Sequence, residues 1–206
     1  MSKEFENLKW YLQAKGQDKS DGYLVNFNML EGYEREGAFT LLADASENDS
    51  YAIPALAELD PIKSVPILKK ILQTEETKEK PGYEKMVNAA GELWLITGEL
   101  IFSEKLGRFI DNPSNNVSKS ALQYLEKKPS ESKNVMKVLR FVVLEDENPI
   151  MQFWAARIIV MTHKIFGGKP LLKDSEKKFL KLLGNEWSNE DRLLGISLLD
   201  KEFPIV

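Results

Sequence analysis

Residues 148–161 read NPIMQFWAARIIVM, and this stretch decides the fold class. Asn148 is a residue type that caps helix N-termini, and Pro149 suits the first helical turn because its φ is already fixed at a helical value. Two adjacent small residues, Ala155 and Ala156, then lie among bulky apolar residues at helical spacing. Short side chains let neighbouring helices approach to about 8–10 Å between their axes. The stretch therefore predicts a helix that stacks against other helices.

The small-residue pattern of this stretch recurs along the chain. A small residue is followed directly by an apolar or small residue, and an aliphatic residue stands at the fifth position. The pattern occurs as Ala55-Leu56-Leu59, Ala89-Ala90-Leu93, Ala121-Leu122-Leu125, Ala155-Ala156-Ile159 and Gly195-Ile196-Leu199. Its first residues are 34, 32, 34 and 40 positions apart, which is the spacing of helix-pair repeats. We therefore expect repeated helix pairs.

Two kinds of segment alternate in these repeats. The segments with the small-residue pattern, named A segments here, are expected to be helical over residues 51–59, 83–97, 117–127, 150–164 and 190–203. The B segments between them carry bulky apolar residues at i, i+3 and i+4 and cover residues 62–73, 103–111, 131–144 and 173–184. Helices are also expected over residues 3–15 and 36–46. No alternating strand pattern is bounded by hairpin turns, so the predicted class is all-α.

These features resemble HEAT repeats, which belong to the armadillo-type α-α superhelices, and in particular the short bacterial kind. The residues that fit best are Asn148, Pro149, Ala155, Ala156, Arg157 and Ile159. The resemblance implies a right-handed superhelix, a HEAT-like solenoid of about five helix pairs. It implies one continuous stack over residues 50–206, preceded by a helical capping region over residues 1–49. The arginine common in the A helices of such repeats is present at Arg157 and Arg192 and replaced elsewhere.

The composition limits the location and class of the protein. Its 206 residues are 43% hydrophobic and 29% charged, the balance of a chain that folds by itself into a domain. Cysteine is absent, which excludes disulfides, thiolate zinc sites and thiol catalysis. The charged N-terminal residues 1–17 do not form a signal peptide, and no apolar run approaches the roughly 20 residues that span a bilayer. We expect a cytoplasmic protein that does not bind membranes.

Few residues carry catalytic or metal-binding chemistry. The only histidine, His163, stands at the end of an A segment, where an interaction with the helix dipole explains it better than catalysis. Residues 44–55 imitate the spacing of a calcium loop but lack its glycine and its bidentate glutamate. Residues 167–169, Gly-Gly-Lys, lack the spacing and the preceding strand of a phosphate-binding loop and are expected to end a helix. We expect no metal, no cofactor and no enzymatic activity.

Charge is distributed unevenly between the segments. The B segments carry a net charge of +7, which leaves −11 for the rest of a chain whose net charge is −4. In HEAT-like superhelices the B helices line the concave face, so the resemblance implies a basic groove; the alternative is that these lysines only solvate exposed helix faces. The residues expected to line the groove are Lys63, Lys69, Lys70, Lys105, Arg108, Lys133, Lys137, Arg140, Lys177, Lys178 and Lys181, with Trp187 as the most exposed tryptophan.

Such a groove fits two functions. The first is non-catalytic binding of a protein with an acidic surface, as a scaffold or an immunity-type inhibitor, in which charge sets orientation and encounter rate. The alternative is binding of nucleic-acid phosphates, as in the HEAT-like DNA alkylation-repair glycosylases, which the chain resembles only in architecture. Asp174 is the nearest candidate for the carboxylate of such an enzyme. A structural role in an assembly is a third hypothesis, and the sequence favours a protein partner.

Overall fold

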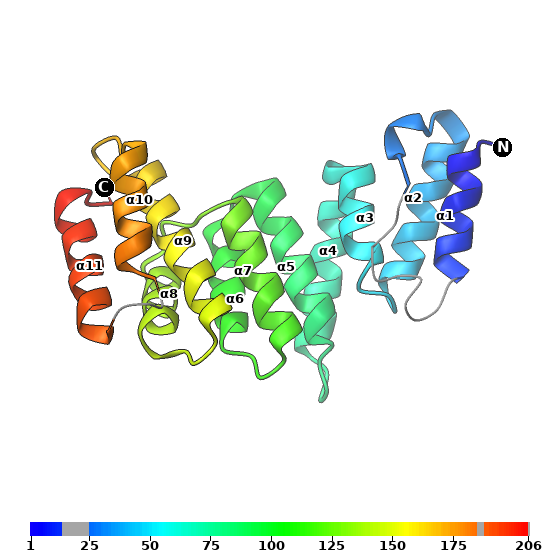
Figure 1. Cartoon of the computed structure of the whole chain (residues 1–206). Coiled ribbons are helices and arrows are strands. Elements are labelled where there is room, and N and C mark those ends of the chain that lie inside the picture. The colour runs from blue at the N-terminus through cyan, green and yellow to red at the C-terminus, as the bar shows by residue number, and fades with distance from the viewer. Residues whose placement is uncertain (14–24, 185–187, 206) are drawn as a thin grey trace. The chain divides into compact units, whose positions relative to one another are not determined.

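A computed structural model of the chain describes residues 1–13, 25–184 and 188–205. In these ranges it contains eleven α-helices, one short 3₁₀ helix and no strand, so the predicted all-α class is confirmed (Figure 1). The elements are α1 (Lys3–Gln13), η2 (Phe27–Met29), α2 (Gly32–Ser46), α3 (Ala52–Leu59), α4 (Pro61–Glu76), α5 (Tyr83–Thr97), α6 (Leu100–Ile110), α7 (Asn115–Lys127), α8 (Lys133–Glu145), α9 (Pro149–Phe166), α10 (Lys173–Leu182) and α11 (Asn189–Glu202). None of the helices described here is both long and apolar enough to cross a membrane.

Side-chain caps fix where several helices begin. The Asp60 carboxylate and the Asn148 side chain each accept a hydrogen bond of 3.0 Å from a backbone N–H in the first turn that follows. A proline at the first helical position follows each of them. Ser188 caps α11 in the same way, at 3.2 Å. The cap at Asn148 is the one predicted from the sequence stretch 148–161, and all three caps satisfy N–H groups that have no partner within the helix.

The chain forms two compact units, residues 1–97 and residues 98–206, called the first and second unit below. The expected boundary after residue 49 falls inside the first unit, which contains α1 to α5.

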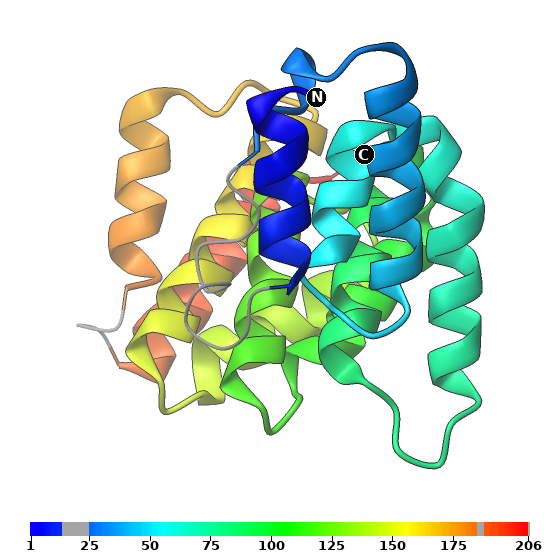
Figure 2. The same ribbon diagram turned by 90° about the vertical axis from the view of Figure 1, so that its right-hand side faces the viewer.

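In the first unit, α3 lies at the centre of the packing. It contacts α2, α4 and α5, and the pairs α2–α3 and α4–α5 share the most extensive contacts of this unit. Helix α1 lies beside α2, as Figure 2 shows, and contributes the buried Phe5 and Leu8 to the core. Leu42 of α2 and Leu56 of α3 are fully buried in the same cluster. The N-terminal helices are thus part of one core with α3.

In the second unit, α6 to α9 form two layers. Helix α7 packs against α9 in one layer and α6 packs against α8 in the other, while α6–α7 and α8–α9 join the layers (Figure 1). The small residues predicted to permit stacking, Ala121 in α7 and Ala155 and Ala156 in α9, are at most 1% exposed. Their burial matches the role that close helix approach requires.

The last helix pair departs from the repeat pattern. In the two layers of α6 to α9, A segments pack against A segments and B segments against B segments, whereas α11, an A segment, packs against α8, a B segment, and α10 lies against α9 and α11. An ion pair of 2.6 Å between Arg140 of α8 and Asp200 of α11 accompanies this arrangement. Gly195 of α11 faces α10 so closely that a Cβ there would lie 3.2 Å from Leu182 and Leu183. Its small size serves the α10–α11 contact.

Candidate functional site

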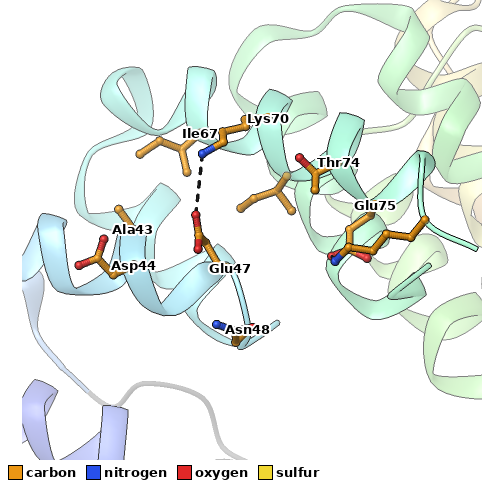
Figure 3. Close-up of a pocket in the computed structure, with 10 residues that line it drawn as sticks. Ala43, Asp44, Glu47, Asn48, Ile67, Lys70, Thr74 and Glu75 are labelled. Carbon is orange, nitrogen blue, oxygen red and sulfur yellow. Dashed lines mark hydrogen bonds and ion pairs between the residues drawn. The ribbon is translucent and has the colours of Figure 1, made fainter. Parts of the chain in front are cut away.

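A cavity of the first unit lies between α2 and α4 and is called the α2–α4 groove here. It encloses about 580 Å³. Four lining residues come from the end of α2 and the turn after it, and six from one face of α4 and the residues after it (Figure 3). They are Ala43, Asp44, Glu47, Asn48, Ile67, Lys70, Ile71, Thr74, Glu75 and Lys78.

The sequence of α4 explains why one of its faces lines the groove. The lining positions of α4 follow one another at spacings of three, one, three and one, which places them on a single helix face. Helix α2 ends at Ser46, and the chain then turns into α3, which begins at Ala52. The groove therefore lies beside the C-terminal end of α2, which carries the negative end of the helix dipole.

The floor of the groove is apolar. Ile71 is buried, and Ala43 and Ile67 are half-buried, so part of their apolar surface remains open to solvent. Burying a large aliphatic side chain from a partner on such a floor contributes about 1.5–3 kcal/mol. The floor can therefore hold an apolar anchor residue.

Ion pairs connect the two helices that border the groove. The Lys70 ammonium lies 3.8 Å from a carboxylate oxygen of Glu47, and both side chains are exposed (Figure 3). Nearer the start of α4, the Lys63 ammonium lies 2.8 Å from Glu36 of α2. Exposed pairs of this kind contribute at most about 1 kcal/mol and exchange partners easily.

Glu75 is the buried charge of the groove. Its carboxylate accepts hydrogen bonds from the ammonium of Lys78 at 2.6 Å and the backbone N–H of Gly82 at 2.8 Å, and it pairs with Lys85. Burial alone would raise the pKa of Glu75, but the hydrogen bonds from Lys78, Lys85 and Gly82 outweigh it and lower the pKa to about 2. Glu75 is thus ionised at neutral pH and ties the loop between α4 and α5 to the end of α4.

Asp44 is the remaining carboxylate of the groove. It is exposed on the last turns of α2, and in the ranges that the structure covers its carboxylate has no hydrogen bond or ion pair (Figure 3). The other two carboxylates of the lining, Glu47 and Glu75, face lysines. Asp44 is therefore the lining carboxylate that has no cation beside it among the described residues.

The basic residues that the sequence assigns to a groove lie on α4, α6, α8 and α10. Most are exposed, and Lys105 and Arg140 are half-buried. Lys70 lines the α2–α4 groove, whereas Lys133 and Arg140 line a different cavity in the second unit. Trp187 lies outside the described residues. The full set is Lys63, Lys69 and Lys70 on α4; Lys105 and Arg108 on α6; Lys133, Lys137 and Arg140 on α8; and Lys177, Lys178 and Lys181 on α10.

The cavity of the second unit encloses about 430 Å³ and contains the single histidine. His163 is 1% exposed, its Nδ1 lies 2.7 Å from the backbone oxygen of Phe203, and its Nε2 lies 3.2 Å from Asp200. Burial lowers the pKa of His163, against the opposing effects of Phe203 and Asp200. Both ring nitrogens therefore face groups of the protein itself. The sequence suggested an interaction with the helix dipole, whereas in the structure burial has the largest effect on the pKa of His163.

The other residues considered for chemistry have structural surroundings. Gly167 directly follows α9, at a place where a Cβ would clash with the backbone oxygen of His163. Trp94 is buried, and Trp154 is half-buried under the ammonium of Lys119 at 5.7 Å. Asp174 is exposed in the first turn of α10. Across the residues that the structure describes, no three acidic or histidine side chains gather as a metal site would require.

Sequence reasoning missed the two carboxylates that define the groove. Glu75 lies at an acidic helix end, a pattern that is typical of solvent-exposed surface. Asp44 was considered only as the first residue of a calcium-loop spacing, which lacks the glycine and the glutamate that such a loop needs. The chain has 32 acidic residues, and no local pattern marks which one is buried or which one lacks a cation. Tertiary neighbours decide both properties.

Comparisons of the chain with models of protein families, with curated proteins and with solved structures find no match.

Proposed function

We propose that the protein is a non-catalytic binding module that holds a segment of another protein in the α2–α4 groove. The observation that carries this proposal is an apolar floor between two charged helices. The volume of the groove falls in the range of about 300–1,000 Å³ that is typical of binding clefts. A helical or extended segment that places an apolar side chain on Ile71 and polar groups along α2 and α4 fits this geometry.

The proposed architecture is a HEAT-like superhelix in a cytoplasmic protein. The recurring small residues and the layered packing of α6 to α9 support it. The last two helices differ from this pattern, because α11 and not α10 packs against α8. Stacked helix pairs expose long faces, which suits the binding of protein segments. Scaffold and inhibitor roles are both consistent with this function.

The paired lysines change the expected chemistry of the partner. The sequence suggests a basic groove, but Lys63 and Lys70 face carboxylates of the same unit, and so does Arg140 in the second unit. Cations that are already paired attract an acidic partner less strongly than free ones. The proposal therefore rests on the shape and apolar floor of the groove.

A selection with displayed peptides tests the proposal. The full-length protein is used to select binders from a library of random peptides shown on phage, and the peptides are then measured against two variants. Thr74→Trp places a bulky side chain at an exposed lining position, and Gln73→Trp adds the same side chain one residue away, outside the lining. We expect peptides that lose binding to Thr74→Trp and keep it with Gln73→Trp. A selection that enriches nothing, or only peptides indifferent to Thr74→Trp, contradicts the proposed function.

A further inference from the structure

The carboxylates of the α2–α4 groove are not equally paired. Three of them line it, those of Asp44, Glu47 and Glu75, together with the ammonium groups of Lys70 and Lys78, and Lys85 beside the groove is a second partner of Glu75. Each ammonium group lies against one of the carboxylates, Lys70 against Glu47 and Lys78 against Glu75. The carboxylate that remains is Asp44.

The surroundings of Asp44 favour a cation beside it. Asp44 lies in the last turn of α2, where the helix dipole places partial negative charge. The nearby backbone oxygen of Glu47 accepts a hydrogen bond of 3.0 Å from Lys85, so one cation of the protein already uses this helix end. The Asp44 carboxylate, being exposed, is open to a cation from outside.

An acidic group in the groove would meet a different environment. It would approach Asp44 and the ionised Glu75, and the exposed Lys70 already faces Glu47. The ammonium group of Lys78 is held at 2.6 Å by the buried Glu75. Like charges that face each other at an interface are unfavourable, so the groove disfavours an acidic segment.

We infer that the partner segment is apolar and basic: an aliphatic or aromatic side chain rests on Ala43, Ile67 and Ile71, and an adjacent lysine or arginine pairs with Asp44. This inference rests on the proposed function and adds the charge of the partner. The apolar anchor supplies most of the affinity, because burial outweighs an exposed ion pair. The basic side chain sets the orientation of the segment, with its cation at the C-terminal end of α2.

The peptides selected on phage also test this inference. Peptides that depend on the groove, as judged by loss of binding to Thr74→Trp, are compared in composition with the unselected library. We expect enrichment of lysine or arginine beside an aliphatic or aromatic residue. Asp44→Asn should weaken these peptides about two- to fivefold, the effect of an exposed ion pair. Glu58→Gln, an exposed carboxylate on α3 outside the lining, is the matched control and should leave their affinity unchanged.

A charge exchange completes the test. Asp44→Lys should weaken the basic peptides further than Asp44→Asn, and replacing the basic residue of the peptide by glutamate should restore binding to Asp44→Lys. Asp44 is exposed, and circular dichroism checks that both variants fold. Groove-dependent peptides that are acidic, or that bind equally to wild type, Asp44→Asn and Asp44→Lys, overturn the inference and leave the proposed function standing. The absence of any groove-dependent peptide overturns both.

Discussion

Glu75 shows how one buried carboxylate can organise a loop. Its partners Lys78 and Gly82 lie in the loop after α4, and its partner Lys85 lies in the first turn of α5. These contacts stabilise the ionised form, so the pKa in the folded protein is about 2 against an ordinary value of 4.5. The contribution of Glu75 to the free energy of unfolding is therefore complete above pH 4.5 and is lost as the pH falls toward about 2.

We predict that Glu75→Gln destabilises the protein by about 2–4 kcal/mol at neutral pH, because it leaves Lys85 and Lys78 beside a neutral group. We expect the wild-type protein to become less stable as the pH falls from about 5 to about 3, and we expect this fall in stability to be smaller in Glu75→Gln. Urea unfolding followed by circular dichroism over this pH range measures both effects. Glu79→Gln, an exposed residue of the same loop, should behave like wild type. If Glu75→Gln left the loss of stability at acid pH unchanged, other carboxylates would be its cause.

His163 titrates under opposing influences. Burial lowers its pKa below the ordinary 6.5, while the Phe203 backbone oxygen and Asp200 act in the other direction. Protonation therefore favours the unfolded chain. The contribution of His163 to stability is complete above about pH 6.5 and falls as the pH drops toward the folded-state pKa.

We predict an imidazole pKa below 6.5 in the folded protein and a still lower value in Asp200→Asn, because that change removes the negative charge near Nε2. The chain has one histidine, so an NMR titration of the imidazole reports this residue alone. The same titration of the urea-unfolded chain provides the reference. A folded-state pKa at or above the unfolded value would mean that Asp200 outweighs burial.

At the scale of helices, local sequence decides where an element begins. We predict that Asn148→Ala and Asp60→Ala each cost about 1 kcal/mol, because each removes a side-chain hydrogen bond to the first helical turn. Ser114→Ala is the matched control: Ser114 precedes α7, but its side chain makes no capping bond, so the cost should stay within a few tenths of a kcal/mol. Chemical denaturation of the three variants measures these values. Equal costs at all three positions would contradict the role of the caps.

The helices could be predicted because apolar residues, which become buried, recur along the chain at the spacing of helical turns. Residues 83–97 are helical with the predicted bounds, and most other ends differ by one to three residues. The places of α10 and α11 were not predictable, because the apolar stripe of a helix indicates which residues become buried and not which neighbour covers them. Leu182, one of the bulky apolar residues of its B segment, remains half-buried while Phe179 and Leu183 are buried.

The candidate groove was predictable only in part. Lys70 could be named because lysines concentrate in the B segments, but its partner Glu47 lies 23 residues earlier and no sequence pattern joins the two. The same holds for Glu36 and Lys63, which are 27 residues apart. Local sequence supplies the type of side chain on a helix face, and tertiary packing supplies the charge that faces it.

At the scale of the whole molecule, charge argues against tight binding of nucleic acid. The net charge is −4, and three of the basic residues that would contact phosphates face carboxylates of this chain. Phosphate binding would have to break these pairs as well as release counterions, and acidic proteins are repelled by the polyanion at long range.

We therefore predict no specific binding of labelled single-stranded DNA, double-stranded DNA or RNA in fluorescence-anisotropy titrations at about 50 mM salt, nor at about 200 mM. Protein with Glu36→Gln and Glu47→Gln serves as a sensitised control, because these changes remove a carboxylate that faces Lys63 and the carboxylate that faces Lys70. Weak binding that appears only in this variant and disappears at the higher salt would confirm that internal pairing suppresses phosphate contacts. Salt-dependent binding by wild type, lost on reversing the charges of Lys69, Lys137 and Lys177, would instead favour the nucleic-acid function, because only phosphate contacts by lysines depend on salt in this way.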